Sequence, residues 1–211
     1  MIQFIAAIII SYLIGSIPTS IIAGRLLKGI DIRDFGSGNA GATNVYRVLG
    51  PIPAIVVVLT DAAKGVAAVL LVAAIVPYSF LGDTDGIRIL CGLSAIVGHS
   101  FPIWANFRGG KGVGTAAGVM FSIIPLESFL LLILFIIVVA VSRYVSLASI
   151  MAGIFLSLIL LFEKYWLGKE ISDILFAVSV FISIFVLFSH HSNIKRLIQG
   201  KENKFGKRIK L

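Results

Sequence analysis

Residues Phe129–Val141 read FLLLILFIIVVAV, a run without one charged or polar side chain. A second long block, Ile2–Ala23, also lacks charged residues. About 20 apolar residues in a helix cross the roughly 30 Å hydrocarbon core of a bilayer. Of the 211 residues, 13% are charged and 58% hydrophobic, whereas a soluble domain has about a quarter of its residues charged. The sequence therefore predicts an all-α integral membrane protein.

Seven segments of the chain are candidates for transmembrane helices. They lie at 2–24, 52–77, 87–103, 112–125, 127–142, 145–162 and 171–190. The fourth and fifth are both short, because they share the stretch 112–142 and are broken only around Pro125. We expect either that the bilayer is thinned there or that one of these helices begins inside a folded loop.

Basic residues concentrate on one side of this arrangement. The segments 25–51, 104–111, 143–144 and 191–211 carry four, two, one and seven of them, fourteen of the eighteen in the chain. The positive-inside rule makes these segments cytoplasmic, with the N-terminus outside and the C-terminus in the cytoplasm. We expect one seven-helix membrane domain over 1–190, with functional loops at 25–51 and 104–111, and a basic cytoplasmic tail over 191–211.

Composition also excludes several kinds of site. The single cysteine, Cys91, excludes an internal disulfide and a cysteine-rich metal site. The formal charge of +8 does not indicate nucleic-acid binding, because most of the basic residues are explained by membrane sidedness.

The densest polar run is FGSGNAGATNVYR at 35–47, in the first long loop. Its three glycines let the backbone approach a ligand and turn N–H groups toward an anion. Asn44 and Arg47 are three residues apart and share a helical face if the run ends in a helix. The expected phosphate-binding residues of this run are Gly36, Ser37, Gly38, Asn39, Gly41, Thr43, Asn44 and Arg47. A flexible turn between helices is the alternative interpretation.

The second run is GHSFPIWANFRGGKGVGT at 98–115. It places Lys111 just before a predicted helix, whose N-terminal N–H groups favour anions. The expected anion-binding residues are Gly109, Gly110, Lys111 and Gly112. The run is not a Walker A motif, because glycine stands at 112 where that motif needs Ser or Thr. For His99 the sequence leaves a structural and a functional role open.

The third run is SHHSNIKRL at 189–197. His190 and Asn193 are three residues apart and face the same way if the helix continues. A dihistidine metal site is disfavoured, because His190 and His191 would diverge by about 100° on a helix.

Asp61 and Lys64 lie within the second predicted span, again three residues apart. Pairing on one helix face is the least costly way to keep both charges in a membrane bundle. We therefore favour a structural ion pair over direct participation in catalysis.

The three runs together resemble the motifs of the bacterial acyl-phosphate-dependent glycerol-3-phosphate acyltransferases, the PlsY type. The family patterns are approximately G-S-G-N-x-G-x-T-N-x-x-R, G-H-x-x-P-x-x-x-x-F-x-G-G-K-G-V and H-x-x-N-I-x-R-L. They are matched in order at 36–47, 98–113 and 190–197, and the likeness spans the whole chain. His191 departs from the family, in which many members carry arginine there, and this puts an anion contact from that position in doubt.

The resemblance implies transfer of a fatty acyl group from acyl phosphate to the sn-1 hydroxyl of glycerol 3-phosphate. The products would be lysophosphatidic acid and inorganic phosphate. It implies a multi-pass protein of the bacterial cytoplasmic (inner) membrane, in contact with membrane lipid, whose active site faces the cytoplasm. It implies no cofactor, no metal and no nucleic-acid partner. The oligomeric state is left undefined, and a monomer is compatible with the sequence.

On the motifs that carry this resemblance, we expect catalytic roles for Ser37, Lys111 and His190, and we add His99 and Asn193 to the expected substrate-binding residues. We expect the first run to hold one phosphate, and Lys111, His190 and Asn193 to hold the other. The proton acceptor is open among His99, His190 and a substrate phosphate oxygen. Acyl phosphate is already activated, so orientation and electrostatic stabilisation are sufficient without an acyl-enzyme.

Two other classes of protein compete with this interpretation. An organic-phosphate transporter would use the same anion-binding loops, but the odd number of spans and the absence of repeated halves disfavour it. An alcohol phosphatidyltransferase needs an array of metal-binding aspartates, and the inner segments contain only Asp31, Asp34 and Glu202 as acids.

Overall fold

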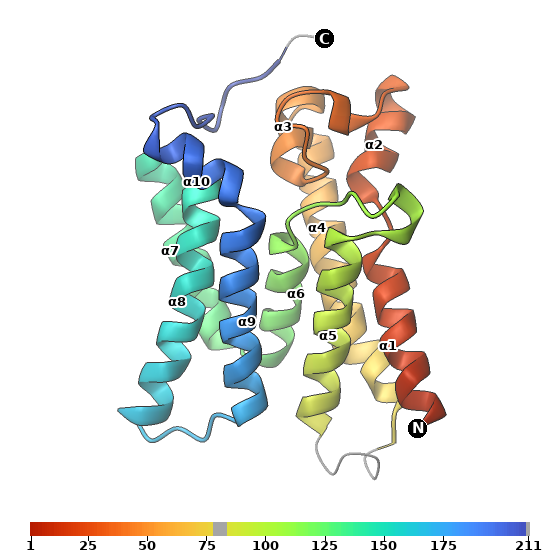
Figure 1. Cartoon of the computed structure of the whole chain (residues 1–211), viewed down its shortest axis with the longest axis vertical. Helices are drawn as coiled ribbons and strands as arrows, with labels where there is room; N and C mark the ends of the chain where they lie inside the picture. The colour runs from red at the N-terminus through yellow and green to blue at the C-terminus, as the bar shows by residue number, and fades with distance from the viewer. Residues whose placement is uncertain (78–83, 210–211) are drawn as a thin grey trace. The chain divides into compact units, whose positions relative to one another are not determined.

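The computed structural model describes residues 1–77 and 84–209, and every regular element in these ranges is a helix. Figure 1 shows the course of the chain. The chain divides into two compact units, which are described separately. Unit 1 comprises Met1–Ile123 with Lys207–Leu211, and unit 2 comprises Ile124–Gly206. The expectation of an all-helical chain is confirmed for the described residues.

Unit 1 contains α-helices joined by short 3-10 and π turns. The α-helices are α1 (Ile2–Gly15), α2 (Thr19–Lys28), α3 (Ala42–Leu49), α4 (Pro51–Ala67), α5 (Thr84–Ser100) and α6 (Val113–Ile123). The turns are η1 (Ile32–Asp34), η2 (Ala68–Val72), η3 (Ala73–Ile75) and η5 (Ile103–Ala105). Helix α1 packs along α5, and α4 packs along α6 (Figure 1).

The first predicted span is broken near its middle. Helix α1 ends at Gly15 and α2 begins at Thr19, because Pro18 has no N–H to donate and disfavours helical geometry at the residue before it. Helix α2 then continues to Lys28, four residues beyond the predicted end. The segment 25–51 is therefore not a simple loop, since it also contains η1 and α3.

Small residues bring α4 and α6 unusually close together. A Cβ atom added to Gly65 would overlap the carbonyl oxygen of Thr115, and one added to Gly118 would overlap that of Ala62. Such close approach is typical of helix pairs in membranes, where packing rather than burial from water drives association. Helix α6 has 11 residues, so at 1.5 Å per residue it is about 16 Å long. Without the local thinning of the bilayer that the sequence analysis allows, α6 is thus too short to span the membrane by itself.

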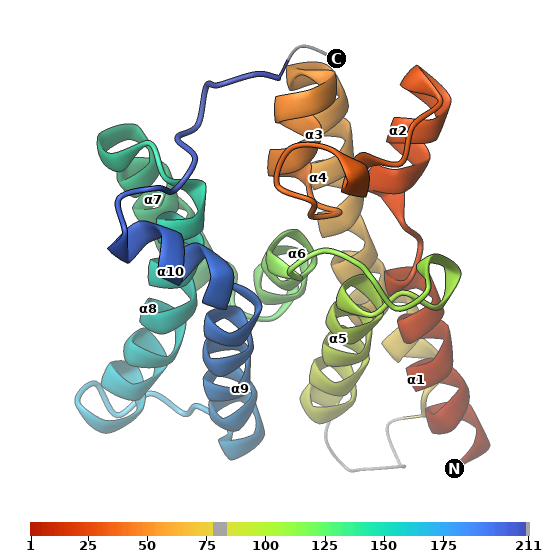
Figure 2. The ribbon, with the colours of Figure 1, turned by 45° about the horizontal axis from the view of Figure 1, so that its top comes forward.

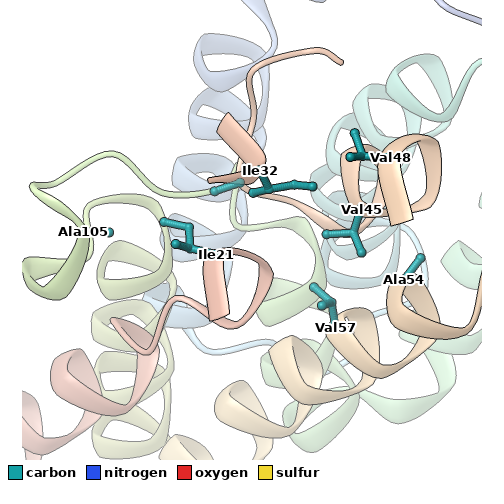
Figure 3. Packing of buried hydrophobic residues seen from close by; sticks show 8 residues of the cluster. Ile21, Ile32, Val45, Val48, Ala54, Val57 and Ala105 are labelled. Carbon is teal, nitrogen blue, oxygen red and sulfur yellow. The ribbon is translucent and has the colours of Figure 1, made fainter. Parts of the chain in front are cut away.

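A hydrophobic cluster packs beneath neither loop alone but includes residues of both polar runs of unit 1. Its buried residues come from α2, η1, α3, α4 and the segments around them (Figure 3): Ile21, Ile32, Ala40, Val45, Val48, Ala54, Val57 and Ala105. Ile32 is fully buried, although it lies in a short turn between helices. Because both polar runs of unit 1 contribute to this one cluster, their backbones are fixed relative to each other.

Unit 2 contains α7 (Pro125–Ser142), α8 (Val145–Tyr165), α9 (Asp173–Ser189) and α10 (His191–Ile198). Helix α8 packs against both α7 and α9. The Ser183 hydroxyl joins α9 to α8 through contacts with the Ser157 hydroxyl and the Gly153 carbonyl. The chain bends by 60° between α9 and α10, so the third polar run continues as a helix only after a change of direction.

Among the described residues, five helical segments are long and apolar enough to cross a membrane, or six if the bent α9–α10 pair forms one span. They include the joined α1–α2 segment, Ile2–Lys28, and α4 with its turns, Pro51–Ile75. The seven-span count, the orientation of the termini and the single domain over 1–190 stay predictions. Within the expected tail at 191–211, the first residues form α10.

Candidate active site

The first polar run forms a loop that bends at two glycines. Gly36 and Gly38 have φ angles of +67° and +71°, a left-handed conformation that residues with a Cβ rarely adopt. Ser37 lies between them and is exposed. Glycine is therefore suited to the backbone conformation at these two positions, and its predicted role in anion binding stays a prediction.

Asn44 holds this loop in shape. Its side chain is 1% exposed, and its Oδ1 accepts a hydrogen bond of 2.8 Å from the Ser37 N–H. Its Nδ2 donates to the carbonyls of Ile32 at 2.9 Å and Phe35 at 3.0 Å. Since an amide has two N–H groups, no donor remains for a phosphate in this conformation. The predicted donation from Asn44 to substrate is replaced by a role in shaping the loop.

Arg47 follows one helical turn later on α3. Its side chain is largely buried, and its carbonyl accepts a 2.8 Å hydrogen bond from the Ile209 N–H, so the end of the described chain packs on α3. Asn39, Gly41 and Thr43 are half-buried between Ser37 and Asn44. These residues keep their predicted place beside the glycine loop.

The second polar run folds back onto the end of α5. The N–H groups of Gly109 and Gly110 donate to the carbonyls of Ser100 and His99, at 3.1 and 3.2 Å. Figure 2 shows the green segment between α5 and α6 making this return. These two amides are therefore used within the protein, which differs from the expectation that they cradle an anion. Lys111 follows directly and is half-buried.

The two runs meet in space. A Cβ atom added to Gly110 would overlap Nε2 of His99 and would lie 3.0 Å from the carbonyl oxygen of Ala40 in the first run. Only glycine fits at this crossing. The first and second runs are therefore in contact, and that they share one substrate site stays a prediction.

Arg33, two residues before the first run, makes contacts with the second run that sequence reasoning missed. Its guanidinium donates to the carbonyls of Ala105 at 2.9 Å and Arg108 at 3.2 Å. It also pairs with Asp31 at 2.7 Å, and its hydrogen bonds hold the pKa of the Asp31 carboxyl below its ordinary value. In the sequence, Arg33 is only one of several basic residues in the loop.

A polar cavity of about 550 Å³ opens between the runs. Gly38 lines it from the first run and Gly109 from the second, together with Asp31, Arg33, Asp34, Asn106 and Arg108. The cavity is large enough for a small phosphorylated molecule, and the Arg108 side chain that lines it is exposed.

Asp61 and Lys64 form the predicted ion pair, at 2.7 Å between Oδ1 and Nζ, with both side chains buried. His99 of α5 lies beside this pair, with Nδ1 3.5 Å from the same Asp61 oxygen. His99 is itself buried. Sequence spacing could not reveal this contact, because it joins different helices.

The third run lies in unit 2. His190 is buried at the bend between α9 and α10, and its Nδ1 donates to the Val186 carbonyl at 2.8 Å. Asn193 donates through Nδ2 to Oε1 of Glu202 at 3.0 Å, and Arg196 donates to the other oxygen of the same carboxylate at 2.8 Å. His191 is exposed.

Glu202 is a residue whose importance the sequence did not reveal. It lies in the predicted basic tail, yet its side chain is buried against Asn193 and Arg196. An acidic residue in an otherwise basic segment was the available signal. The tail after α10 therefore begins as an ordered part of unit 2.

The apolar helices, and the polar cavity lined by the loops between them, define an integral membrane protein with a candidate polar site. The sequence profile described as glycerol-3-phosphate acyltransferase matches residues 5–200. This chain belongs to the glycerol-3-phosphate acyltransferase family, as its three motifs predicted.

Curated relatives and solved structures agree with this membership. A glycerol-3-phosphate acyltransferase of Chlorobium phaeobacteroides (strain BS1) is 46% identical, over 97% of each chain. One of Chlorobaculum tepidum is 42% identical, over 99% of this chain and all of the relative. The crystal structure of PlsY, an integral membrane glycerol 3-phosphate acyltransferase, in its glycerol 3-phosphate form has a TM-score of 0.83 at 35% identity, covering 96% of both chains. Its lysophosphatidic acid form has a TM-score of 0.82 at 34% identity.

Proposed function

We propose that this protein transfers a fatty acyl group from acyl phosphate to the sn-1 hydroxyl of glycerol 3-phosphate. The products are lysophosphatidic acid and inorganic phosphate. The observation that carries the proposal is the meeting of two glycine-rich runs at Ala40 and Gly110, beside a polar cavity, in a member of this family. Both substrates carry a phosphate, so a site with loops and cations of this kind suits them.

In the proposed reaction, the sn-1 oxygen attacks the carbonyl carbon of acyl phosphate. The bond from that carbon to the phosphate oxygen breaks, and the hydroxyl proton passes to a base. Ser37 and Arg47 hold one phosphate, and Lys111, His190 and Asn193 hold the other. Their positive charges and donors stabilise the oxyanion of the tetrahedral intermediate and the departing phosphate.

Asn39, Gly41, Thr43 and Gly112 complete the proposed substrate contacts. Gly112 has a φ of +78° immediately before α6, so it turns the chain from Lys111 into that helix. For the proton acceptor, His99, His190 and a substrate phosphate oxygen all remain candidates. A pH profile of kcat in His99→Gln and His190→Gln, compared with the wild type, separates them.

The transfer is proposed to be direct, without an acyl-enzyme. Ser37 is exposed, and the sequence pattern pairs it with no general base. Mass spectrometry of protein quenched with acyl phosphate alone tests this point. An acyl adduct that is lost in Ser37→Ala would show that the reaction proceeds through the serine instead.

The activity itself is tested with purified protein in detergent. Glycerol 3-phosphate is supplied with palmitoyl phosphate, palmitoyl-CoA or palmitoyl acyl carrier protein, and released phosphate and lysophosphatidic acid are measured. We expect product only from palmitoyl phosphate, and its loss in Arg47→Ala but not in Arg25→Ala, which removes an exposed cation of α2. Activity with palmitoyl-CoA alone would refute the acyl-phosphate donor.

An organic-phosphate transporter is the second candidate, because the same loops and cavity could hold a phosphate ester during transport. The detergent assay separates the two, since a carrier does not release phosphate from acyl phosphate. Uptake of radiolabelled glycerol 3-phosphate into proteoliposomes, without phosphate release in detergent, would favour the transporter.

We also propose seven membrane segments in the bacterial cytoplasmic membrane, with the N-terminus outside and the site facing the cytoplasm. The distribution of basic residues supports this orientation. A thiol at Lys201→Cys should react with an impermeant maleimide only after cells are opened, and one at Glu170→Cys should react in intact cells. The native Cys91 is buried, so its labelling should not interfere. The reverse pattern would invert the topology.

A further inference from the structure

A cluster of buried polar groups lies beneath the point where the two runs meet. Oδ1 of Asp61 accepts hydrogen bonds from the Thr19 hydroxyl at 2.6 Å and from Lys64 Nζ at 2.7 Å. Lys64 also donates to the Ile17 carbonyl at 2.6 Å, in the break between α1 and α2. One carboxylate and one ammonium group of α4 therefore join this helix to the junction between α1 and α2.

His99 is the member of this cluster nearest to the loops. Its Nδ1 faces Oδ1 of Asp61 at 3.5 Å, while its Nε2 lies against Gly110, where a side-chain Cβ would not fit. The exposed fractions of His99 and Asp61 are 8% and 3%. The imidazole ring is thus enclosed between a carboxylate on one edge and the glycine turn on the other.

The charges around the ring decide which nitrogen carries a proton. The charged groups of this cluster are the Asp61 carboxylate and the Lys64 ammonium, and of these the carboxylate faces the ring. A carboxylate beside one ring nitrogen favours a proton on that nitrogen and fixes the orientation of the ring. With Nδ1 protonated toward Asp61, the Nε2 edge is held toward Gly110.

Gly110 connects the His99 ring to the two polar runs. It lies between the His99 ring and the Ala40 carbonyl of the first run, and Lys111 is the next residue along the chain. A small rotation of His99 would therefore displace the glycine turn, the first run, or both.

We propose that Asp61 is a positioning residue for the acyl transfer. Its carboxylate orients His99, and His99 in turn fixes the Gly110 turn that places Lys111 and the first run. Asp61 itself touches no substrate in this scheme. The proposal rests on the proposed function, because it concerns the efficiency of that reaction.

The orientation of His99 is measured without any reaction, by NMR of protein labelled with ¹⁵N-histidine. The chain has three histidines, and the spectrum of His99→Gln identifies the signals of residue 99. We expect a protonated Nδ1 in the wild type, and a shift of this resonance toward that of an unprotonated nitrogen in Asp61→Asn. An unchanged Nδ1 resonance in Asp61→Asn would refute the proposal.

The kinetic consequence is measured as kcat/KM for glycerol 3-phosphate. We expect Asp61→Asn to lower kcat/KM by roughly 10- to 100-fold, because a shift of binding groups by up to about 1 Å has an effect of this size. The same substitution should have little further effect in a His99→Gln background, because its effect passes through His99. If the two losses multiply instead, Asp61 acts independently of His99 and the proposal fails.

Two further variants separate positioning from loss of stability. Asp61→Asn alone leaves the Lys64 ammonium buried without a counter-ion, and this variant can fail to fold for that reason. In that case the double variant Asp61→Asn/Lys64→Gln, which removes both charges, is measured instead by the same NMR and kcat/KM experiments. Ser94→Ala is the matched control, because Ser94 lies on α5 and bonds to the Ile8 carbonyl of α1 at 2.8 Å, away from the cluster. A fall in kcat/KM in Ser94→Ala equal to that in Asp61→Asn would show general destabilisation and overturn the proposal.

The two proposals fail in different ways. If the wild-type protein releases no phosphate from acyl phosphate, the proposed function is wrong, while the NMR experiment still tests the contact between Asp61 and His99. If the wild type is active and Asp61→Asn matches it in both readouts, the positioning role alone is wrong.

Discussion

Replacing Asn44 by alanine should destabilise the glycine loop rather than only weaken substrate binding. The side chain makes three hydrogen bonds, to the Ser37 N–H and to the carbonyls of Ile32 and Phe35. The bond to Ile32 is buried, whereas the other two are partly buried. A typical net value is about 1 kcal/mol for each bond and more for a buried group left unpaired, so we expect a loss of about 2–4 kcal/mol.

The assay is thermal unfolding of the purified protein in detergent, together with steady-state kinetics. A loss of this size should lower the apparent midpoint by about 5–10 °C, and both kcat and KM should deteriorate as the loop loses its shape. Asn44→Asp should not rescue the loop, because its second oxygen would face the carbonyls of Ile32 and Phe35. The control is Thr60→Ala, which removes an exposed hydroxyl bonded to its own helix.

The opposite result would identify a different role for the amide. If Asn44→Ala melts like the wild type and only the KM for a phosphorylated substrate rises, the side chain binds ligand directly. Its assignment to loop shape would then be wrong.

Three other outcomes follow from the same contacts. Gly110→Ala should lower kcat/KM by about 10-fold or more, because the added Cβ overlaps His99. The control, Gly29→Ala, has open space around the added Cβ and should show only the backbone strain of a left-handed residue, about 1–2 kcal/mol. Equal kcat/KM values in the two variants would contradict the packing argument. Asp31 has a lowered pKa in the folded protein, so its stabilising contribution is present above the ordinary carboxyl pKa and is lost as pH falls through the lowered one. Melting curves should therefore show Asp31→Asn less stable than the wild type at neutral pH, and the difference should shrink as the pH falls below about 4, the ordinary carboxyl pKa. A difference that does not change with pH would argue against the ion pair. Lys169→Gln removes the partner of the Glu127 and Glu163 carboxylates in unit 2. It should lower the midpoint of thermal unfolding by a few degrees, on the order expected for an exposed member of an ion-pair cluster, without changing kcat. A fall in kcat at an unchanged midpoint would count against a structural role.

The apolar blocks of the sequence predict an all-helical protein, but they do not predict where its helices begin and end. Hydropathy does not distinguish a continuous helix from one interrupted at Pro18, because no charged residue occurs between Ile2 and Gly24. The short helix α6 was anticipated from the closeness of Pro125. Its packing depends on Gly65 and Gly118, whose importance appears only when α4 and α6 lie together.

The chemistry-bearing runs were found from sequence because their residue types are unusual in a membrane protein. The hydrogen-bond and ion-pair partners of those residues could not be found from the sequence. Asn44 bonds to carbonyls of Ile32 and Phe35, and backbone carbonyls have no sequence signature. The contact of Asp61 with His99 joins different helices, so a search for residues three or four apart recovers only the pair with Lys64.

During biogenesis, α4 must carry a carboxylate and an ammonium into hydrocarbon. A lone charge at the centre of an inserting helix costs about 2.5–3.5 kcal/mol on translocon scales. Asp61 and Lys64 are one turn apart, so they can neutralise each other within the newly inserted helix, before any neighbour arrives. The contacts from Ile17, Thr19 and His99 come from other segments and form only on lateral assembly. Insertion of this helix and completion of its polar centre are therefore separable steps.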